Sequence, residues 1–226
     1  MIYALYGFVL GLIVPYMARR FAKFMPASAA ESIWRLICSG KRIAWQKRLN
    51  NQRYKKLLSA YFWRSFMYAI ACSGLFYCAV QHFGSFGLGG ILAFIWALVL
   101  LFEIDCKTML LPDVVTVPLL IGGFVFASFY GAWIVSAESA IGAVIGYVLP
   151  VVAALFVVWK HSDAFGGGDI KLLSAVGAWL GGKLVIYVII LAAVLFSVYA
   201  LIMRKKSGAF GPAIAVAAII VAFYFF

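Results

Sequence analysis

Long apolar runs alternate with short polar or glycine-rich segments along most of the chain, and this pattern restricts the fold more than any other feature. Hydrophobic residues make up 66% of the 226 residues and charged residues only 12%, a balance far from that of soluble globular domains. Inside lipid, each backbone polar group must find its partner within the protein, so apolar runs of this length favour α-helices. The sequence therefore predicts an all-α, polytopic membrane protein.

The apolar runs predict about eight transmembrane helices. Most of the runs approach the length that crosses roughly 30 Å of hydrocarbon. The sixth is short, so we expect part of its start to lie in a cavity lined by protein. The predicted spans are residues 2–18, 61–81, 91–104, 114–135, 140–159, 169–182, 184–203 and 210–226.

Positive charge is concentrated in one segment near the start of the chain. Twelve of the 19 Lys and Arg residues lie between Arg19 and Arg64, accompanied by one acid, Glu31. Nucleic-acid binding would also need such basicity, but the positive-inside rule explains it with a loop that faces the cytoplasm and anionic lipid. We therefore predict a first helix at 1–18, a basic cytoplasmic loop at 19–64 and a transmembrane bundle at 65–226, with membrane lipid and no nucleic acid as a partner.

The order of charges around the first apolar run predicts its orientation. Arg19, Arg20 and Lys23 follow this run, whereas a signal peptide carries its charges before the apolar segment. We expect an uncleaved helix with the N-terminus outside, and eight alternating spans then place the C-terminus outside as well. Within the basic loop, residues 39–56 fit either an amphipathic helix on the lipid headgroups or a solvated loop.

The four cysteines give no sign of a metal site or a disulfide framework. They contain no C-x-x-C pair and no histidine at a spacing suited to zinc. We therefore predict no bound metal. The cysteines are Cys38, Cys72, Cys78 and Cys106.

The acids are concentrated in two polar segments that the predicted topology brings to the same membrane face. Two carboxyl groups held together share one proton, because both cannot be charged without repulsion. The charged carboxylate can then take a proton from water while the protonated one polarises a carbonyl, as in aspartic proteases. Five of the seven acids lie in these segments, namely Glu103, Asp105, Asp113, Asp163 and Asp169.

Sequence position separates the roles of these acids only in part. Asp105 ends one predicted span, and Asp169 starts another directly after three glycines, where a simple helix cap is the alternative role. Asp113 follows Pro112 and fits a capping role as well as a catalytic one. Asp163 is typical of a solvated loop charge, and the neighbouring His161 of a surface group.

Lys107 and Lys171 lie close to these acids in sequence. Both fit anchors on the cytoplasmic side of the membrane, and both also fit a role in tuning the neighbouring carboxylates. The three glycines Gly166, Gly167 and Gly168 predict a tight turn and close backbone approach.

Two sequence blocks resemble the signature blocks of bacterial type IV prepilin peptidases, which are GxGD-type aspartic proteases of the inner membrane. The first is EIDCKTMLLPD at 103–113 with the following VVTVPLL, and the second is GGGDIKLLSAVGAWLG at 166–181. Two long blocks in the expected order make the likeness specific. The blocks fall within 103–120 and 165–182, and the resemblance covers about residues 90–205.

The resemblance implies an activity and a pair of catalytic residues. Carried over from the family, the catalytic aspartates are Asp105 and Asp169. The implied substrates are prepilins or pseudopilins, whose basic leader stays in the cytoplasm and whose apolar helix lies in the membrane. Gly166–Gly168 would let the scissile backbone come close, with Asp113, Lys107 and Lys171 in supporting or substrate-binding roles. Proteolysis of this kind needs no cofactor.

The N-terminal third departs from the family. Many members carry a G-S-F-x-N-V-x-x-x-R-x-P block and a cytoplasmic four-cysteine zinc site, whereas this chain has GLIVPYMARR at 11–20 and lacks the cysteine pairs. Many members also methylate the new N-terminus, so S-adenosylmethionine is a cofactor only if that activity is retained. Two alternatives stay open from the residues alone, a polytopic transporter or channel and a presenilin-like intramembrane protease.

Overall fold

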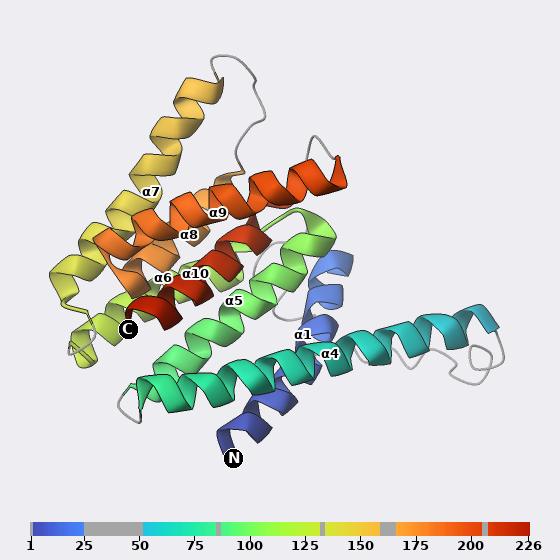
Figure 1. Ribbon diagram of the computed structural model, residues 1–226. Coiled ribbons are helices and arrows are strands. Elements are labelled where there is room, and N and C mark those ends of the chain that lie inside the picture. Colours follow the sequence, from blue (N-terminus) through green and yellow to red (C-terminus); the bar gives the residue numbers. More distant parts are fainter. Residues whose placement is uncertain (1, 25–51, 85–86, 132–133, 159–165, 205–207) are drawn as a thin grey trace. The chain divides into compact units, whose positions relative to one another are not determined.

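The structure, a computed structural model, describes residues 2–24, 52–84, 87–131, 134–158, 166–204 and 208–226. Within these ranges the chain forms α-helices joined by turns and short connecting segments, with no strand (Figure 1). The predicted all-α fold is therefore confirmed for the described residues. The helices are α1 (Ile2–Phe24), α4 (Gln52–Phe83), α5 (Leu88–Thr108), α6 (Asp113–Phe129), α7 (Ser136–Val158), α8 (Gly167–Leu180), α9 (Gly182–Met203) and α10 (Gly211–Phe225).

Five of the described helices are long and apolar enough to cross a membrane, judged by length and composition. They are the part of α1 from Ile2 to Ala22, the part of α4 from Ser59 to Phe83, α5, the part of α7 from Ser136 to Leu155, and α9. Helices α6 and α10 are apolar but shorter, and α8 has only 14 residues. The chain is thus a polytopic membrane protein, although fewer helices reach full spanning length than the eight runs predicted.

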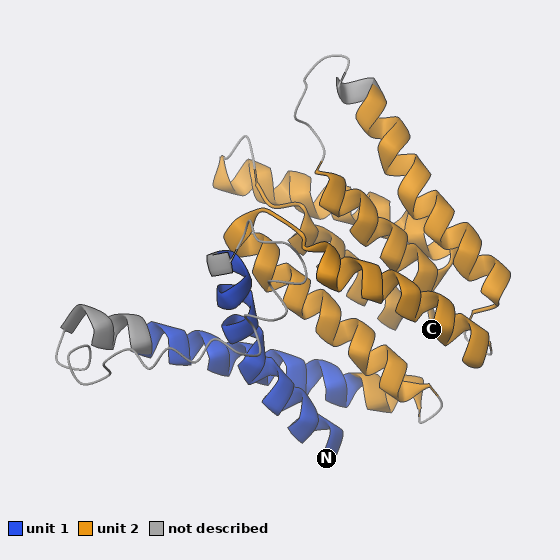
Figure 2. Ribbon diagram, turned by 180° about the vertical axis from the view of Figure 1, so that it is seen from behind, with its two compact units in different colours: residues 1–78 blue, residues 79–226 orange. Residues whose placement is uncertain are grey.

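The chain divides into two compact units, residues 1–78 and 79–226 (Figure 2). In the first unit, α1 and α4 approach closely where α1 carries Gly7 and Gly11. A Cβ atom at Gly7 would meet the backbone of Cys72, and one at Gly11 the backbone of Tyr68. Small residues allow this kind of close helix contact in membranes.

Helix boundaries in the first unit differ from the predicted ones. Helix α1 continues six residues beyond position 18, and α4 begins at Gln52, so residues 52–64 of the predicted loop are helical. Most of the segment 39–56, for which the sequence left a surface helix or a solvated loop open, lies outside the described residues. His161 and Asp163 also lie outside them.

The second unit is built around α8, the short helix after the glycine run. At about 1.5 Å of rise per residue, 14 residues extend roughly 21 Å, well short of the hydrocarbon thickness. Every residue from Leu172 to Leu180 is buried, and α8 contacts α6, α7, α9 and α10. A helix enclosed by protein does not need to match the bilayer thickness, which explains why so short a helix is tolerated here.

Glycine and serine residues join α8 to α7. The backbones approach so closely that a Cβ atom at Gly142 would collide with the carbonyl oxygen of Gly177, and one at Gly177 with that of Gly142. Ser139 and Ser174 donate side-chain hydrogen bonds to carbonyl oxygens of the opposite helix, at 2.6 and 2.9 Å. In lipid, such close packing and interhelical hydrogen bonds are the main sources of helix association.

An aromatic cluster joins the far end of α8 to α5 and α6. The ring of Trp179 stacks on Phe94 of α5 and Phe126 of α6, with centroid distances of 4.9 and 5.0 Å. Its indole nitrogen donates a 2.8 Å hydrogen bond to the carbonyl oxygen of Leu119, so the polar end of the side chain is also satisfied. These contacts fix the C-terminal end of α8.

The glycine contact between α7 and α8 predicts the response to a single added methyl group. Gly142→Ala should destabilise the protein by about 1–3 kcal/mol or more, because the obstructing atoms belong to the backbone and cannot rotate away. Gly89→Ala on α5 is the matched control, since a Cβ atom there meets nothing within 4 Å. Thermal unfolding in detergent measures both, and equal midpoints for the two variants would contradict the proposed packing.

Candidate active site

Asp105 lies in the last helical turn of α5 and is almost completely buried, with 3% of its surface exposed. Its Oδ2 accepts a 2.9 Å hydrogen bond from the backbone N–H of Gly211, the first residue of α10. The first N–H groups of a helix have no partner within the helix, and they carry the positive end of its dipole. The carboxylate of Asp105 therefore satisfies one of these donors and is held in a fixed position.

Asp169 is the third residue of α8, and it is half-buried. Gly166 occupies the N-cap position, and no side chain caps the helix. The alternative in which Asp169 acts as a simple helix cap is therefore wrong. Its carboxyl group lies next to Gly166, where a Cβ atom would stand 3.1 Å from Asp169 Oδ2.

The two aspartates line the same cavity, which has a volume of about 410 Å³. One wall comes from the end of α5, one from the start of α8, and the others from α9 and the segment that leads into α10. The lining residues besides Asp105 and Asp169 are Met109, Gly166, Ala193, Phe196, Ser197, Gly208, Ala209 and Phe210.

Electrostatics couple the two carboxyl groups. The charge of Asp105 acts on Asp169, so the two groups are close enough to repel each other when both are charged. Among the described residues neither aspartate forms an ion pair, and the lining of the cavity contains no lysine or arginine. Sharing one proton relieves the repulsion in such a pair, and it leaves a proton acceptor and a proton donor side by side.

Asp113 and Lys171 pair with each other outside the cavity. The ammonium group of Lys171 on α8 contacts both carboxylate oxygens of Asp113, at 2.8 and 2.7 Å, across the starts of α6 and α8. Both side chains are largely exposed. Asp113 is the first residue of α6, and no side chain caps this helix. The capping alternative for Asp113 is therefore wrong, and the side chain instead links the starts of α6 and α8.

Lys107 forms an ion pair with Glu103, four residues earlier on α5. Glu103 is completely buried, which is costly for a carboxylate without a partner. Lys107 therefore compensates a buried charge, in addition to any contact with lipid headgroups, and it is not among the residues that line the aspartate cavity.

The glycines at 166–168 matter because they lack side chains that would block close contacts, and not because of unusual backbone angles. Among the described residues, the glycines with positive φ are Gly84, Gly87 and Gly181, so the backbone at Gly166–Gly168 needs no left-handed angles. Gly166 borders the cavity, Gly167 faces open space, and a Cβ atom at Gly168 would stand 2.9 Å from that of Leu111. Only Gly166 is therefore placed to let another backbone approach Asp169, while Gly168 serves packing within the chain.

Sequence reasoning missed the contribution of the segment before α10. Gly208, Ala209 and Phe210 line the cavity, and Gly211 binds Asp105. The available signal was Gly211-Pro212, which is typical of a helix start because proline fits the first turn. That pattern locates the helix end but does not indicate which carboxylate it meets.

Neither a metal site nor a cofactor site emerges from the described residues. They contain no group of three or more His, Cys, Asp or Glu side chains arranged to hold a metal ion. Among the described residues, those that line the aspartate cavity offer carboxylates but no cation for the carboxylate of S-adenosylmethionine. These described residues therefore do not fit that cofactor, and we assign it no step.

Comparison with known proteins connects this cavity to a family. Residues 91–201, which include both aspartates of the cavity, match the type IV leader peptidase family. Residues 91–201 are therefore similar to the type IV leader peptidase family, and this region makes up just under half of the chain. Gly208, Ala209 and Phe210, which also line the cavity, and Gly211, which binds Asp105, lie beyond the matched region. No solved structure matches the chain significantly.

Curated relatives carry the name prepilin leader peptidase/N-methyltransferase. The protein of Aeromonas salmonicida is 37% identical over 132 residues, which cover 54% of this chain and 44% of that protein. The Dichelobacter nodosus protein is 37% identical over 143 residues, covering 62% and 50% respectively. The Stutzerimonas stutzeri protein is 36% identical over 158 residues, covering 66% and 54%. The match thus spans about half the length of these relatives.

The ion pair between Asp113 and Lys171 predicts a small effect on stability. Exposed pairs contribute about 0–1 kcal/mol, so Lys171→Met should lower the free energy of unfolding by no more than about 1 kcal/mol. Each single charge reversal, Asp113→Lys or Lys171→Asp, should also lower stability. The double variant that carries both reversals should recover most of the lost stability, because the opposite charges still meet. Thermal unfolding in detergent is the measurement. A double exchange less stable than either single reversal would mean that the two side chains act separately.

Proposed function

We propose that the protein is a membrane aspartic endopeptidase that removes the basic leader peptide from type IV prepilins or pseudopilins at the cytoplasmic face of the inner membrane. The observation that carries this proposal is the shared cavity, because Asp105 and Asp169 come from two different helices within the matched region and line one space. The names of the relatives supply the substrate class.

The chemistry follows from two carboxyl groups that share a proton. The charged carboxylate takes a proton from a water molecule, whose oxygen attacks the scissile carbonyl carbon, while the protonated carboxyl group donates a hydrogen bond to the carbonyl oxygen. The proton is then passed to the leaving nitrogen as the C–N bond breaks. The hydrogen bond from Gly211 keeps Asp105 in place through this cycle, and Gly166 leaves room for the substrate backbone.

The position of the cavity suits a substrate with a polar leader and an apolar helix. Asp105 is near the end of α5, Asp169 and Asp113 are at the starts of α8 and α6, and Arg204 follows the end of α9. Basic residues at helix ends favour the cytoplasmic side. A basic leader would then stay in water while the scissile bond reaches the carboxylates.

Two other readings of the sequence receive less support from the described residues. Transporters of this size place ionisable groups near the middle of their spans, and here the aspartates lie in the last turn of α5 and the first turn of α8. The same terminal positions argue against a presenilin-like protease, for which we expect deeper aspartates.

The proposal predicts that Asp105→Asn and Asp169→Asn each reduce leader cleavage at least a thousandfold, because either change removes one half of the proton-sharing pair. Asp113→Asn is the matched control. It makes the same chemical change at an exposed carboxylate outside the cavity and should retain most of the activity.

The measurement is cleavage of a purified prepilin in detergent, followed by mass spectrometry of both products. Size-exclusion elution and thermal unfolding verify that each variant is folded. Normal cleavage by either cavity variant would overturn the assignment of the pair, and complete loss in Asp113→Asn would transfer a catalytic role to Asp113. In parallel reactions with S-adenosylmethionine, methylation would raise the mass of the cleaved pilin by about 14 Da, the mass of one CH₂ group.

The contact between Gly211 and Asp105 predicts a second, independent effect on cleavage. A Cβ atom there would stand 2.6 Å from Asp105 Oδ2, so Gly211→Ala should displace the carboxylate. Misplacement of a reacting group by about 1 Å costs on the order of a hundredfold in rate. Gly89→Ala, on α5 and outside the cavity lining, meets nothing within 4 Å and should keep a near-normal rate. Equal cleavage rates for the two variants would show that Gly211 does not position Asp105.

A further inference from the structure

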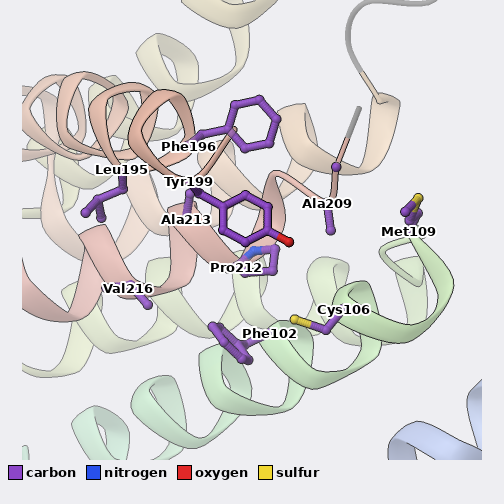
Figure 3. Close-up of a pocket in the computed structure, with 11 residues that line it drawn as sticks. Phe102, Cys106, Met109, Leu195, Phe196, Tyr199, Ala209, Pro212, Ala213 and Val216 are labelled. Carbon is purple, nitrogen blue, oxygen red and sulfur yellow. The ribbon is translucent and has the colours of Figure 1, made fainter. Parts of the chain in front are cut away.

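A second cavity, of about 370 Å³, adjoins the aspartate cavity in the same unit. Figure 3 shows side chains from three helices around it: Phe102 and Cys106 from α5, Leu195, Phe196 and Tyr199 from α9, and Pro212, Ala213 and Val216 from α10. Of the lining residues that the structure describes, none is charged and almost all are apolar. Its volume lies within the range of ligand pockets, roughly 300–1,000 Å³.

The two cavities share part of their walls. Met109, Phe196, Gly208 and Ala209 line both of them. A group bound in the apolar cavity therefore lies next to the space in which Asp105 and Asp169 act. If the apolar cavity lay far from the carboxylates, any acyl chain would fit it. Because it shares walls with the aspartate cavity, it favours a molecule that occupies both cavities at once.

We propose that this apolar cavity binds the first apolar side chains of the substrate on the C-terminal side of the scissile bond, where the transmembrane helix of the substrate begins. The inference rests on the proposed function and adds the subsite that recognises the membrane-embedded part of the substrate. The leader and the scissile bond occupy the aspartate cavity, and the residues that follow enter the apolar one. Burial of apolar surface on the protein then contributes to substrate binding.

Two substrates and one pair of variants separate this subsite from the catalytic pair. The first substrate is a full-length prepilin, and the second is a soluble peptide that ends a few residues after the scissile bond and lacks the apolar helix. Val216→Trp fills the cavity from α10. Ile220→Trp makes a comparable change one helical turn later, at an exposed position that does not line the cavity.

The subsite predicts that Val216→Trp raises the KM for full-length prepilin about tenfold or more, which corresponds to the loss of one buried apolar side chain. Cleavage of the short peptide by this variant should be unchanged. Ile220→Trp should match the wild type with both substrates. Equal KM values for the two variants with full-length prepilin would overturn the subsite and leave the proposed peptidase standing. A wild type that cleaves neither substrate would instead overturn the proposed function.

Thiol labelling gives a readout that does not depend on turnover. In a variant that keeps Cys106 as its one cysteine and carries Asp105→Asn, full-length prepilin should slow maleimide modification of Cys106 several-fold, and the short peptide should not. If phospholipid slows the modification as much as prepilin does, the occupant is an acyl chain and the proposal fails. Equal protection by the two substrates would also overturn it, because the apolar helix would then contribute nothing.

Discussion

The close crossing of α7 and α8 is the contact on which the second unit depends. Because neither helix has a side chain where Gly142 faces Gly177, the two backbones meet directly, and serine hydroxyl groups on both helices pair with the opposite backbone. This contact helps to enclose α8 among four other helices. A helix of 14 residues cannot span a bilayer alone, but as an enclosed element it brings its first turn, with Asp169, into a cavity inside the protein.

Helix ends supply the other parts of the candidate active site. The last turn of α5 carries Asp105, the first N–H group of α10 binds it, and the start of α8 carries Asp169. The starts of α8 and α10 have unpaired N–H groups and the positive end of a helix dipole, both of which favour a nearby carboxylate. The last turn of α5 offers neither, so Asp105 depends on the N–H group of Gly211. The apolar cavity lies beside this site because part of its wall comes from α5 and α10, the helices that carry Asp105 and Gly211.

The sequence was sufficient to predict the all-α membrane fold and the short sixth helix, because apolar run length is a local feature. The choice of Asp105 and Asp169 came from the family resemblance, and their catalytic role stays a prediction. The partners of the charged residues were not predictable in this way. Lys171 meets Asp113, which lies 58 residues away, and Gly211 meets Asp105 at a separation of 106 residues. Those pairings depend on how the helices pack, and the glycines that control this packing look the same in sequence whether they serve turns, catalysis or helix contact.

The central claim is that Asp105 and Asp169 face each other across one cavity within one chain. A variant with cysteines at 105 and 169 and no other cysteine tests it most directly, using a short bifunctional thiol reagent, proteolysis and mass spectrometry. The account predicts an intramolecular cross-link between the two peptides in the folded protein, lost after unfolding in detergent, with only single-site modification in the two single-cysteine controls. Separate modification of both cysteines in the folded protein, with no link between them, would contradict the account.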